Sequence, residues 1–159
     1  MMYYFWGMIF FVFTLNTCLH AGILSVVGPC QEAPLFSNSF QVKSQEIKSI
    51  GRVSLEVFEQ FQVPYLGTEQ GINSIFDTPI GIDAMEVISS SEYLAYGWCY
   101  KVNEIEPSEF PHEIQAKNND VILWWFGYAR YKDGQWIEQC TPSYLRRSAK
   151  FCPKKTIQD

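Results

Sequence analysis

The fold of this chain is decided by the stretch Gly97-Trp98-Cys99-Tyr100-Lys101-Val102-Asn103 and by its partner, Asn119-Asp120-Val121-Ile122-Leu123-Trp124-Trp125-Phe126. Both segments are rich in aromatic and β-branched residues, and turn-forming residues bound each of them. Such residues favour a pleated surface with one buried face. The two segments therefore predict neighbouring strands over residues 94–103 and 121–132.

A tight turn follows the second of these strands. Asp133-Gly134 separates residues 121–132 from the strand-like residues 135–140. An Asp-Gly pair between two such runs is the strongest short-range signal for a hairpin. We therefore expect a third strand that folds back on the second.

The segments upstream predict one more strand and a single helix. Apolar and polar residues alternate along residues 52–59, which is the period of a half-buried strand. Residues 61–65 are expected to continue as a second strand or a bulged extension. Thr78-Pro79 predicts the start of a short helix with Ile82, Met85 and Ile88 on one face. The order of strand, helix and strands predicts an α+β domain with one short helix packed on one face of the sheet.

The remaining N-terminal part is expected to lack regular structure. Residues 22–49 are interrupted by Gly28-Pro29 and Ala33-Pro34, and residues 67–71 resemble a loop. We therefore divide the chain into a leader (1–21), an N-terminal extension (22–50), a domain (51–144) and a basic C-terminal tail (145–159).

The first 21 residues indicate export. They contain no Asp, Glu, Lys or Arg, residues 8–15 are almost wholly apolar, and the small residue Ala21 ends the segment. This pattern predicts a signal peptide that is cleaved after Ala21, and hence a secreted or periplasmic protein. Two alternatives stay open: a membrane anchor retained over residues 1–18, and lipid attachment at Cys18.

Charge limits the classes of partner. The net charge is −5, and the acidic residues dominate the chain before residue 145. An acidic body argues against nucleic acid as a partner. The tail carries Arg146, Arg147, Lys150, Lys154 and Lys155. It is either a solvated terminus or a contact to an anionic membrane surface or polymer.

Four cysteines follow the leader: Cys30, Cys99, Cys140 and Cys152. An even number in a small exported domain predicts two disulfides. The sequence allows three connectivities. A short loop favours Cys140 with Cys152, which leaves Cys30 for Cys99, but a bond between the two terminal cysteines is also reasonable.

Exposed aromatic residues are the candidate binding site. Trp124, Phe126 and Tyr128 share one face of their strand and are expected to pack under the helix, whereas Trp125 points to the other face. Trp136 on the hairpin partner is expected to join Trp125. These two residues, together with Tyr128, are the candidate ligand-binding residues. Such a patch suits sugar rings or a protein partner. The alternative is that a chain extension tethered by Cys30 or Cys152 covers this face.

Signs of catalysis are weak. Cys99 with His112 has the residue types of a nucleophile and its base, but a disulfide removes the thiol. The acidic loop Glu104, Glu106, Glu109 and Glu113 offers carboxylates for glycoside hydrolysis, and such a loop is more often a solvated surface. The cysteine spacing lacks the short pairs of a zinc site. We therefore expect no catalytic residues, no metal and no cofactor.

The residues Ile82-Asp83-Ala84-Met85, the strand ending Val102-Asn103 and the turn Asn119-Asp120 before Val121-Ile122-Leu123-Trp124 resemble the extracytoplasmic domain family DUF4430. In that family an Asp-Ala helix precedes an aromatic strand ending Val-Asn-Gly, and a Gly-Asp turn leads into a Val-x-Trp strand. The resemblance covers about residues 51–130, with Glu104 and Asn119 standing at the glycine positions. It implies a β-grasp-like α+β fold with a mixed or antiparallel sheet, and no catalytic residues. The family is similar to the carboxy-terminal domain of transcobalamin, but corrinoid binding does not follow.

These observations predict a non-catalytic, disulfide-stabilised extracytoplasmic module that binds a partner protein or a small ligand through one sheet face. The alternative is a small secreted enzyme or redox protein that uses Cys99 with His112, or the acidic loop. A third interpretation is an inhibitor-like domain that presents the loop from Glu104 to Glu113.

Overall fold

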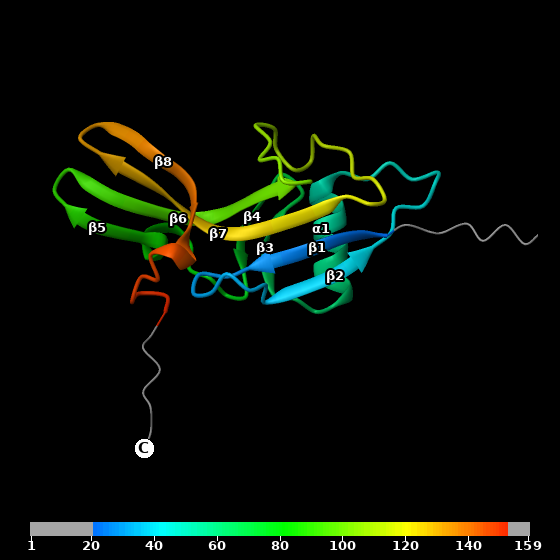
Figure 1. Cartoon of the computed structure of the whole chain (residues 1–159), viewed down its shortest axis with the longest axis horizontal. Coiled ribbons are helices and arrows are strands. Elements are labelled where there is room, and N and C mark those ends of the chain that lie inside the picture. Colours follow the sequence, from blue (N-terminus) through cyan, green and yellow to red (C-terminus); the bar gives the residue numbers. More distant parts are fainter. Residues whose placement is uncertain (1–20, 153–159) are drawn as a thin grey trace, which may run out of the picture.

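The computed structural model describes residues 21–152. In chain order, these residues form β1 (Gly22–Val27), β2 (Phe36–Phe40), α1 (Ile50–Gln60), β3 (Tyr65–Thr68), β4 (Gly71–Ile75), the 3₁₀ helix η1 (Gly81–Ala84), β5 (Met85–Ser89), β6 (Glu92–Val102), β7 (Val121–Lys132), β8 (Gln135–Pro142) and the 3₁₀ helix η2 (Ser143–Leu145). The predicted leader, apart from Ala21, and residues 153–159 of the basic tail lie outside the described residues. Figure 1 shows a long curved sheet with α1 against one face.

The main sheet is mixed. Its strands follow the order β2-β1-β7-β6-β5, and β8 also pairs with β7. Strand β1 runs parallel to β7, and the other pairs are antiparallel. Strand β1 pairs with residues 121–125 of β7 and β8 pairs with residues 127–132, so the two strands share one edge of the long β7. This architecture confirms the expected α+β class.

The β6–β7–β8 meander confirms the strands expected from the aromatic segments. Asp133 and Gly134 have φ angles of 48° and 90°, which are the left-handed values that a two-residue hairpin turn requires. The turn places Lys132 opposite Gln135 and Tyr131 opposite Trp136. The turn signal thus fixed both the connection and its register.

The strand expected over residues 52–59 is wrong, because these residues belong to α1. Ser49 caps the helix: its hydroxyl accepts a hydrogen bond from the Arg52 backbone N–H at 3.0 Å. The buried residues Ile50, Val53, Val57 and Phe58 have the spacing of one helical face, i, i+3, i+7 and i+8. Val53 and Val57, four residues apart, share a face in either a strand or a helix, and packing against the sheet selects the helix.

The helix expected after Thr78-Pro79 is also wrong. The helical part is limited to a single 3₁₀ turn over Gly81–Ala84, and the Gly81 backbone is left-handed at φ 60°. The residues that follow form β5, with Met85 opposite Ala95 of β6. Ile82 is 81% exposed, so the supposed apolar helix face has no sheet to cover. Pairing with β6 satisfies the backbone groups here, whereas a short helix without a packed apolar face would be only marginally stable.

The N-terminal residues expected to be irregular instead form β1 and β2. Strand β1 lies inside the sheet between β2 and β7, and Leu24 and Val26 are fully buried. Residues 65–75 form a separate β3–β4 hairpin where a loop over 67–71 was expected. Long-range parallel pairing of β1 with β7 leaves no local sequence pattern, which explains why the strand was not predicted.

Two apolar clusters lie on the α1 side of the sheet. The larger one packs α1 against β1 and β7, with Phe58, Leu24 and Trp124 at its centre. The Trp124 indole N–H donates to the buried Ser54 hydroxyl at 3.0 Å. The smaller cluster contains Ala84, Leu94, Tyr96 and Phe126, and Phe151 covers it. Trp124 is therefore buried in the core as expected, but the helix that covers it is α1 and not the one expected after Thr78-Pro79.

Candidate functional site

The open face of the protein is the sheet face opposite α1. It carries the odd-numbered residues of β7, because successive side chains of a strand alternate between faces and Trp124 points to α1. Cross-strand pairing adds Lys101, Cys99, Gly97, Ala95 and Tyr93 of β6 to the same face. The side chains on this face decide which surface is available to a partner.

Trp125 lies on the open face, but the chain covers it. The side chain is only 4% exposed, and its indole N–H donates to the Cys140 carbonyl oxygen at 2.8 Å. A depression of about 370 Å³ lies beside it, lined also by Leu123, Pro142 and Tyr144. Strand β8 and the turn after it therefore cover Trp125, which differs from the expected alternative of a chain extension tethered by Cys30 or Cys152.

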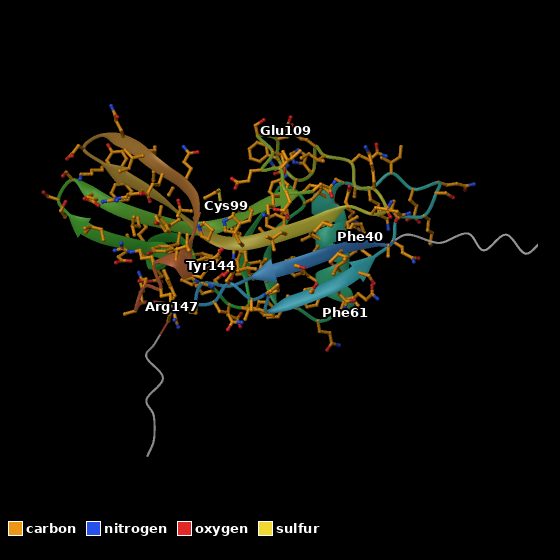
Figure 2. The ribbon with its side chains drawn as sticks, viewed as in Figure 1. Phe40, Phe61, Cys99, Glu109, Tyr144 and Arg147 are labelled. Atoms are coloured by element: carbon orange, nitrogen blue, oxygen red, sulfur yellow. A yellow bond between two sulfur atoms is a disulfide. The ribbon has the colours of Figure 1, made fainter. Side chains whose placement is uncertain are left out.

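A disulfide holds β8 across the open face (Figure 2). Cys99 of β6 is bonded to Cys140 of β8 with a Cα separation of 5.9 Å, although β7 lies between these strands in the sheet. The crossing is tight at Gly127, because a β-carbon there would lie 3.2 Å from both the Cys140 carbonyl carbon and the Trp125 indole nitrogen, and these neighbours would have to shift by a few tenths of an ångström. The absence of a side chain at Gly127 lets β8 approach this face of β7.

The aromatic row occupies the far end of the open face. We define it as Val87, Tyr93, Tyr131 and Trp136, which are cross-strand neighbours on β5, β6, β7 and β8. The Tyr93 and Tyr131 rings stack at 4.8 Å, and Trp136 meets them edge-on at 5.7 and 5.4 Å. Val87 is 76% exposed and Trp136 is 48% exposed. The row is an apolar surface built across four adjacent strands.

The structure does not bring the three predicted binding residues together. Trp125 and Trp136 lie on the same face, but Trp125 lies under Cys140 and Trp136 lies near the β7–β8 turn. Tyr128 belongs to the opposite face, where its ring centre is 5.8 Å from that of Tyr96. Of the three, only Trp136 contributes to the aromatic row.

Val87, Tyr93 and Tyr131 are the members of the row that the sequence did not lead us to expect. A signal was present for Tyr131, because the two-residue turn at Asp133-Gly134 sets it opposite Trp136. Counting back along the hairpin from this turn would have found the pair. The position of Tyr93 depends on the register of β6, which a loop of many residues separates from β7.

The disulfide pairing differs from the preferred one. Cys30 is bonded to Cys152, and Cys99 is bonded to Cys140. The preferred bonds, Cys140 with Cys152 and Cys30 with Cys99, are therefore wrong. Cys140 lies over Cys99 on the open face, and β1 carries Cys30 to the C-terminal segment, where the Cα atoms of Cys30 and Cys152 are 5.5 Å apart.

The candidate catalytic residues take part in bonds within the fold. The Cys99 sulfur is bonded to Cys140, so it presents no thiol to His112. The acidic loop is used in part for structure: the Tyr100 hydroxyl donates to the Glu109 carbonyl oxygen at 2.7 Å, and Glu113 accepts from the Phe110 N–H at 2.8 Å. Burial, followed by the nearby Glu109 and Glu113 charges, raises the pKa of Tyr100 to about 12. Within residues 21–152, no three His, Cys, Asp or Glu residues are placed to hold a metal ion.

The first part of the basic tail is docked onto the sheet. Arg146 forms an ion pair with Glu86 at 3.1 Å, and Glu86 also accepts from the Tyr96 hydroxyl at 2.8 Å. Burial alone would raise the pKa of Glu86, but the hydrogen bonds from Tyr96 and Arg146 outweigh it and the pKa is lowered. Burial and the same carboxylate raise the pKa of Tyr96 to about 12. This part of the tail is therefore a structural element of the domain.

Comparison with known proteins returned no relative. No protein-family model matches the chain, and neither the curated proteins nor the solved structures contain a match to it. None of the helices in residues 21–152 combines the length and the apolar character needed to cross a membrane. The two disulfides are typical of an oxidising compartment outside the cytoplasm.

Proposed function

We propose that this protein is a non-catalytic, disulfide-stabilised extracytoplasmic module that binds a partner protein through the aromatic row. The single observation that carries this proposal is the exposure of Val87 and Trp136 at the two ends of a row that spans four strands. Tryptophan and tyrosine are enriched among the residues that contribute most to protein interfaces, because they bury large apolar areas with few rotatable bonds.

The acidic character of the open face favours a partner that combines apolar and basic surface. Glu32, Glu104 and Glu106 line the depression beside Trp125, and Lys101 is the only basic residue among the residues that line it. Lys101 is itself paired with Glu104. Complementary charge increases the rate and specificity of association more than its affinity.

We also propose a β-grasp-like fold, for which the strand order is the argument, and a relation to DUF4430. Two antiparallel strands come first, α1 lies on one face, and the parallel pair β1 and β7 occupies the middle of the order β2-β1-β7-β6. The Val102-Asn103 and Asn119-Asp120 motifs meet in space, since Asn103 donates to Asp120 at 2.8 Å. We propose export by cleavage after Ala21, which would deliver these cysteines to a compartment where they oxidise.

The test compares partners of the wild-type protein with two variants. Peptides selected against the wild-type protein from a displayed library are measured against Trp136→Ala and against Ile47→Ala, which removes a side chain that is 85% exposed on the segment before α1. We expect Trp136→Ala to weaken binding by tenfold or more, in line with about 2 kcal/mol for an aromatic residue that dominates an interface, and Ile47→Ala to leave it unchanged. Binders that tolerate Trp136→Ala equally well would overturn the proposal.

A thiol titration of the folded, oxidised protein tests the rival enzyme or redox interpretation. The binding module requires Cys30, Cys99, Cys140 and Cys152 to be unreactive toward a thiol reagent until the protein unfolds or is reduced. A redox protein that uses the Cys99–Cys140 bond would instead exchange it rapidly with a small dithiol while remaining folded. Rapid exchange of that kind would favour the rival interpretation.

A further inference from the structure

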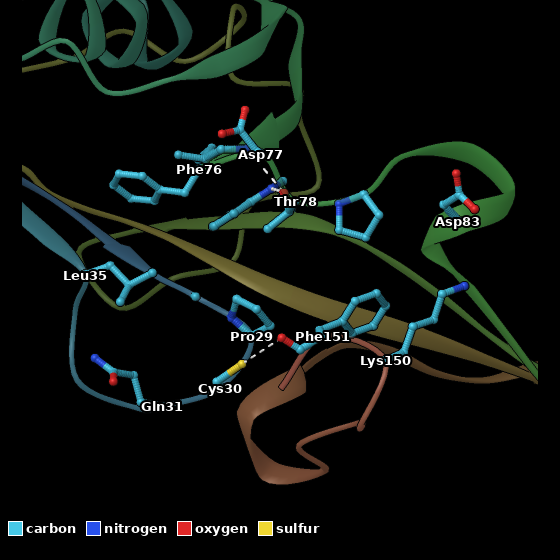
Figure 3. Close-up of a pocket in the computed structure, with 14 residues that line it drawn as sticks. Pro29, Cys30, Gln31, Leu35, Phe76, Asp77, Thr78, Asp83, Lys150 and Phe151 are labelled. Carbon is cyan, nitrogen blue, oxygen red and sulfur yellow. Dashed lines mark hydrogen bonds between the residues drawn. The ribbon is translucent and has the colours of Figure 1, made fainter. Parts of the chain in front are cut away.

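A second cavity lies on the α1 side of the sheet, away from the open face. Its volume is about 540 Å³, within the range of small-molecule sites. Figure 3 shows Phe76, Asp77 and Thr78 on one side and Pro29, Cys30 and Phe151 on the other, with strands behind them. Segments far apart in the sequence therefore line it.

Apolar side chains form most of the cavity wall. Leu35 follows β1, Phe76 and Pro79 lie between β4 and η1, and Phe151 comes from the C-terminal segment. Trp98 of β6 also lines the cavity. A wall of this kind binds the apolar body of a ligand because contact removes apolar surface from water.

The cavity is held open by bonds on two sides. The Cys30–Cys152 disulfide joins the segment that follows β1 to the C-terminal segment that carries Phe151. On the other side, the Trp98 indole N–H donates to the Thr78 hydroxyl at 2.8 Å, and the Ser74 hydroxyl donates to the Thr78 carbonyl oxygen at 2.7 Å. These bonds fix the walls before any ligand arrives, which lowers the entropic cost of binding.

The backbone between β4 and η1 is strained where it borders the cavity. Phe76 and Asp77 are consecutive non-glycine residues in the left-handed region, with φ angles of 53° and 56°. Such conformations cost free energy and cluster at ligand-binding segments. The Phe76 N–H donates to the Pro64 carbonyl oxygen at 2.9 Å, which anchors the strained pair to the β3 side.

The charges at the rim favour a cation. Asp77 and Asp83 both line the cavity and are exposed, and neither forms an ion pair within the described residues. Lys150 is the only basic residue of the lining, and its ammonium group donates to the Met85 carbonyl oxygen at 2.7 Å. The lining therefore carries two carboxylates with no ion pair among the described residues and one ammonium group that is already hydrogen-bonded, in a chain of net charge −5.

We propose that this cavity binds a small amphipathic amine, with its apolar or aromatic body between Leu35, Phe76 and Phe151. The protonated nitrogen of the ligand stays at the rim, where the Asp77 and Asp83 carboxylates attract it and water still reaches it. The site lies on the opposite side of the sheet from the aromatic row and is independent of the partner proposed there.

Three probes with one body and different charges test the proposal. Binding of 4-phenylbutylamine, 4-phenylbutanol and 4-phenylbutanoate is followed by NMR through the Trp98 indole N–H resonance, assigned with Trp98→Phe. We expect the amine to bind with a Kd on the order of 1 mM, as fits a ligand of this size. The alcohol should bind more weakly, and the carboxylate at least about tenfold more weakly than the amine. High salt should reduce the advantage of the amine, because the carboxylates are exposed.

Matched variants separate the rim charges from the overall charge. Asp77→Asn with Asp83→Asn should bring the amine within about twofold of the alcohol, and asparagine tolerates the left-handed backbone at position 77. Glu106→Gln with Glu109→Gln removes the same charge from an exposed loop and should leave amine binding unchanged. Thermal unfolding of each variant checks that it is folded.

Three outcomes would overturn the proposal. The first is a carboxylate probe that binds as tightly as the amine. The second is amine binding that persists unchanged in the Asp77→Asn, Asp83→Asn protein. The third is a Trp98 resonance that none of the three probes moves at saturating concentration.

Discussion

At the scale of single residues, the Asn103–Asp120 pair closes the end of the β6–β7 ladder. The Asn103 amide group donates to Asp120 at 2.8 Å, and its oxygen accepts from the Val121 N–H at 2.9 Å. The buried Asp120 also accepts from the Lys117 N–H at 2.7 Å. These residues therefore have a structural role, because they hold the ends of β6 and β7 together.

Replacing Asn103 should lower the free energy of unfolding. Asn103→Ala leaves the Val121 N–H and the Asp120 carboxylate short of a partner, which should cost about 1–3 kcal/mol. Position 103 is left-handed at φ 52°, so Asn103→Gly should be less damaging than Asn103→Ala by about 1 kcal/mol. Urea unfolding followed by tryptophan fluorescence measures both values. Equal stabilities of the two variants would show that the left-handed backbone at position 103 contributes nothing to the difference. A wild-type stability for Asn103→Gly would show that the Asn103 side-chain hydrogen bonds do not stabilise the fold.

At the scale of elements, α1 is positioned by a close approach to the β3–β4 hairpin. A β-carbon at Gly51 would lie 2.0 Å from the Glu69 carbonyl oxygen, so only glycine fits in the first turn of the helix. Arg52 and Glu69 are paired at 3.4 Å across the same contact. The hairpin and the helix therefore form one packed unit, in which position 51 has no room for a side chain.

This contact reverses the usual effect of a glycine-to-alanine change in a helix. Alanine normally stabilises a helix by about 1 kcal/mol relative to glycine, but Gly51→Ala should destabilise the protein by about 1–3 kcal/mol because it overpacks the contact with Glu69. Gly97→Ala is the control, since no atom lies within 4 Å of the β-carbon it would add. Chemical denaturation of both variants measures the effect. Stabilisation by Gly51→Ala would show that the hairpin can move away at no cost.

At the scale of the whole molecule, the two ends of the described chain complete the fold. Strand β1 lies inside the sheet, and the segment after η2 covers the smaller apolar cluster with Phe151. The Cys30–Cys152 disulfide spans 122 residues, and the Arg146–Glu86 ion pair fastens the same C-terminal segment to β5. The packed unit therefore extends over residues 22–152, on both sides of the expected domain of residues 51–144.

The docking of the C-terminal segment should depend on acid pH through Glu86. Because the folded-state pKa of Glu86 is lowered, its stabilisation is complete above the unfolded pKa of about 4.3 and is lost as the pH falls through the folded value. Glu86→Gln should therefore be less stable than the wild type at pH 7, with a difference that shrinks below about pH 4.

Thermal unfolding from pH 7 to pH 3 measures this difference. Glu106→Gln, at an exposed site with no ion pair within the described residues, is the control and should follow the wild-type profile. A constant gap between Glu86→Gln and the wild type over this range would contradict the proposed linkage.

The candidate site could be predicted from the sequence only where its residues are local. Trp136 was selected correctly as an open-face residue, and Tyr131 follows from the same turn. Trp125 was assigned to the correct face, but its exposure depends on β8, which crosses the face because Gly127 leaves room. Tyr93 and Val87 join the row through pairings with distant strands. The cavity beside Trp98 has no sequence signal, since its walls come from four remote segments.

The sequence by itself determined the β6–β7–β8 meander, the alternation of its two faces and the presence of four cysteines suited to two disulfides. These features depend on neighbours along the chain: a two-residue turn fixes a register, and a strand alternates its side chains whatever lies around it. The tertiary structure alone decided that residues 50–60 are helical, that β1 enters the sheet and which cysteines are bonded. The physical reason is that apolar residues four apart fit a strand or a helix, and only packing against the sheet, with Ser54 bonded to Trp124, selects the helix. Likewise, sulfur atoms bond only where the folded backbone brings them within reach.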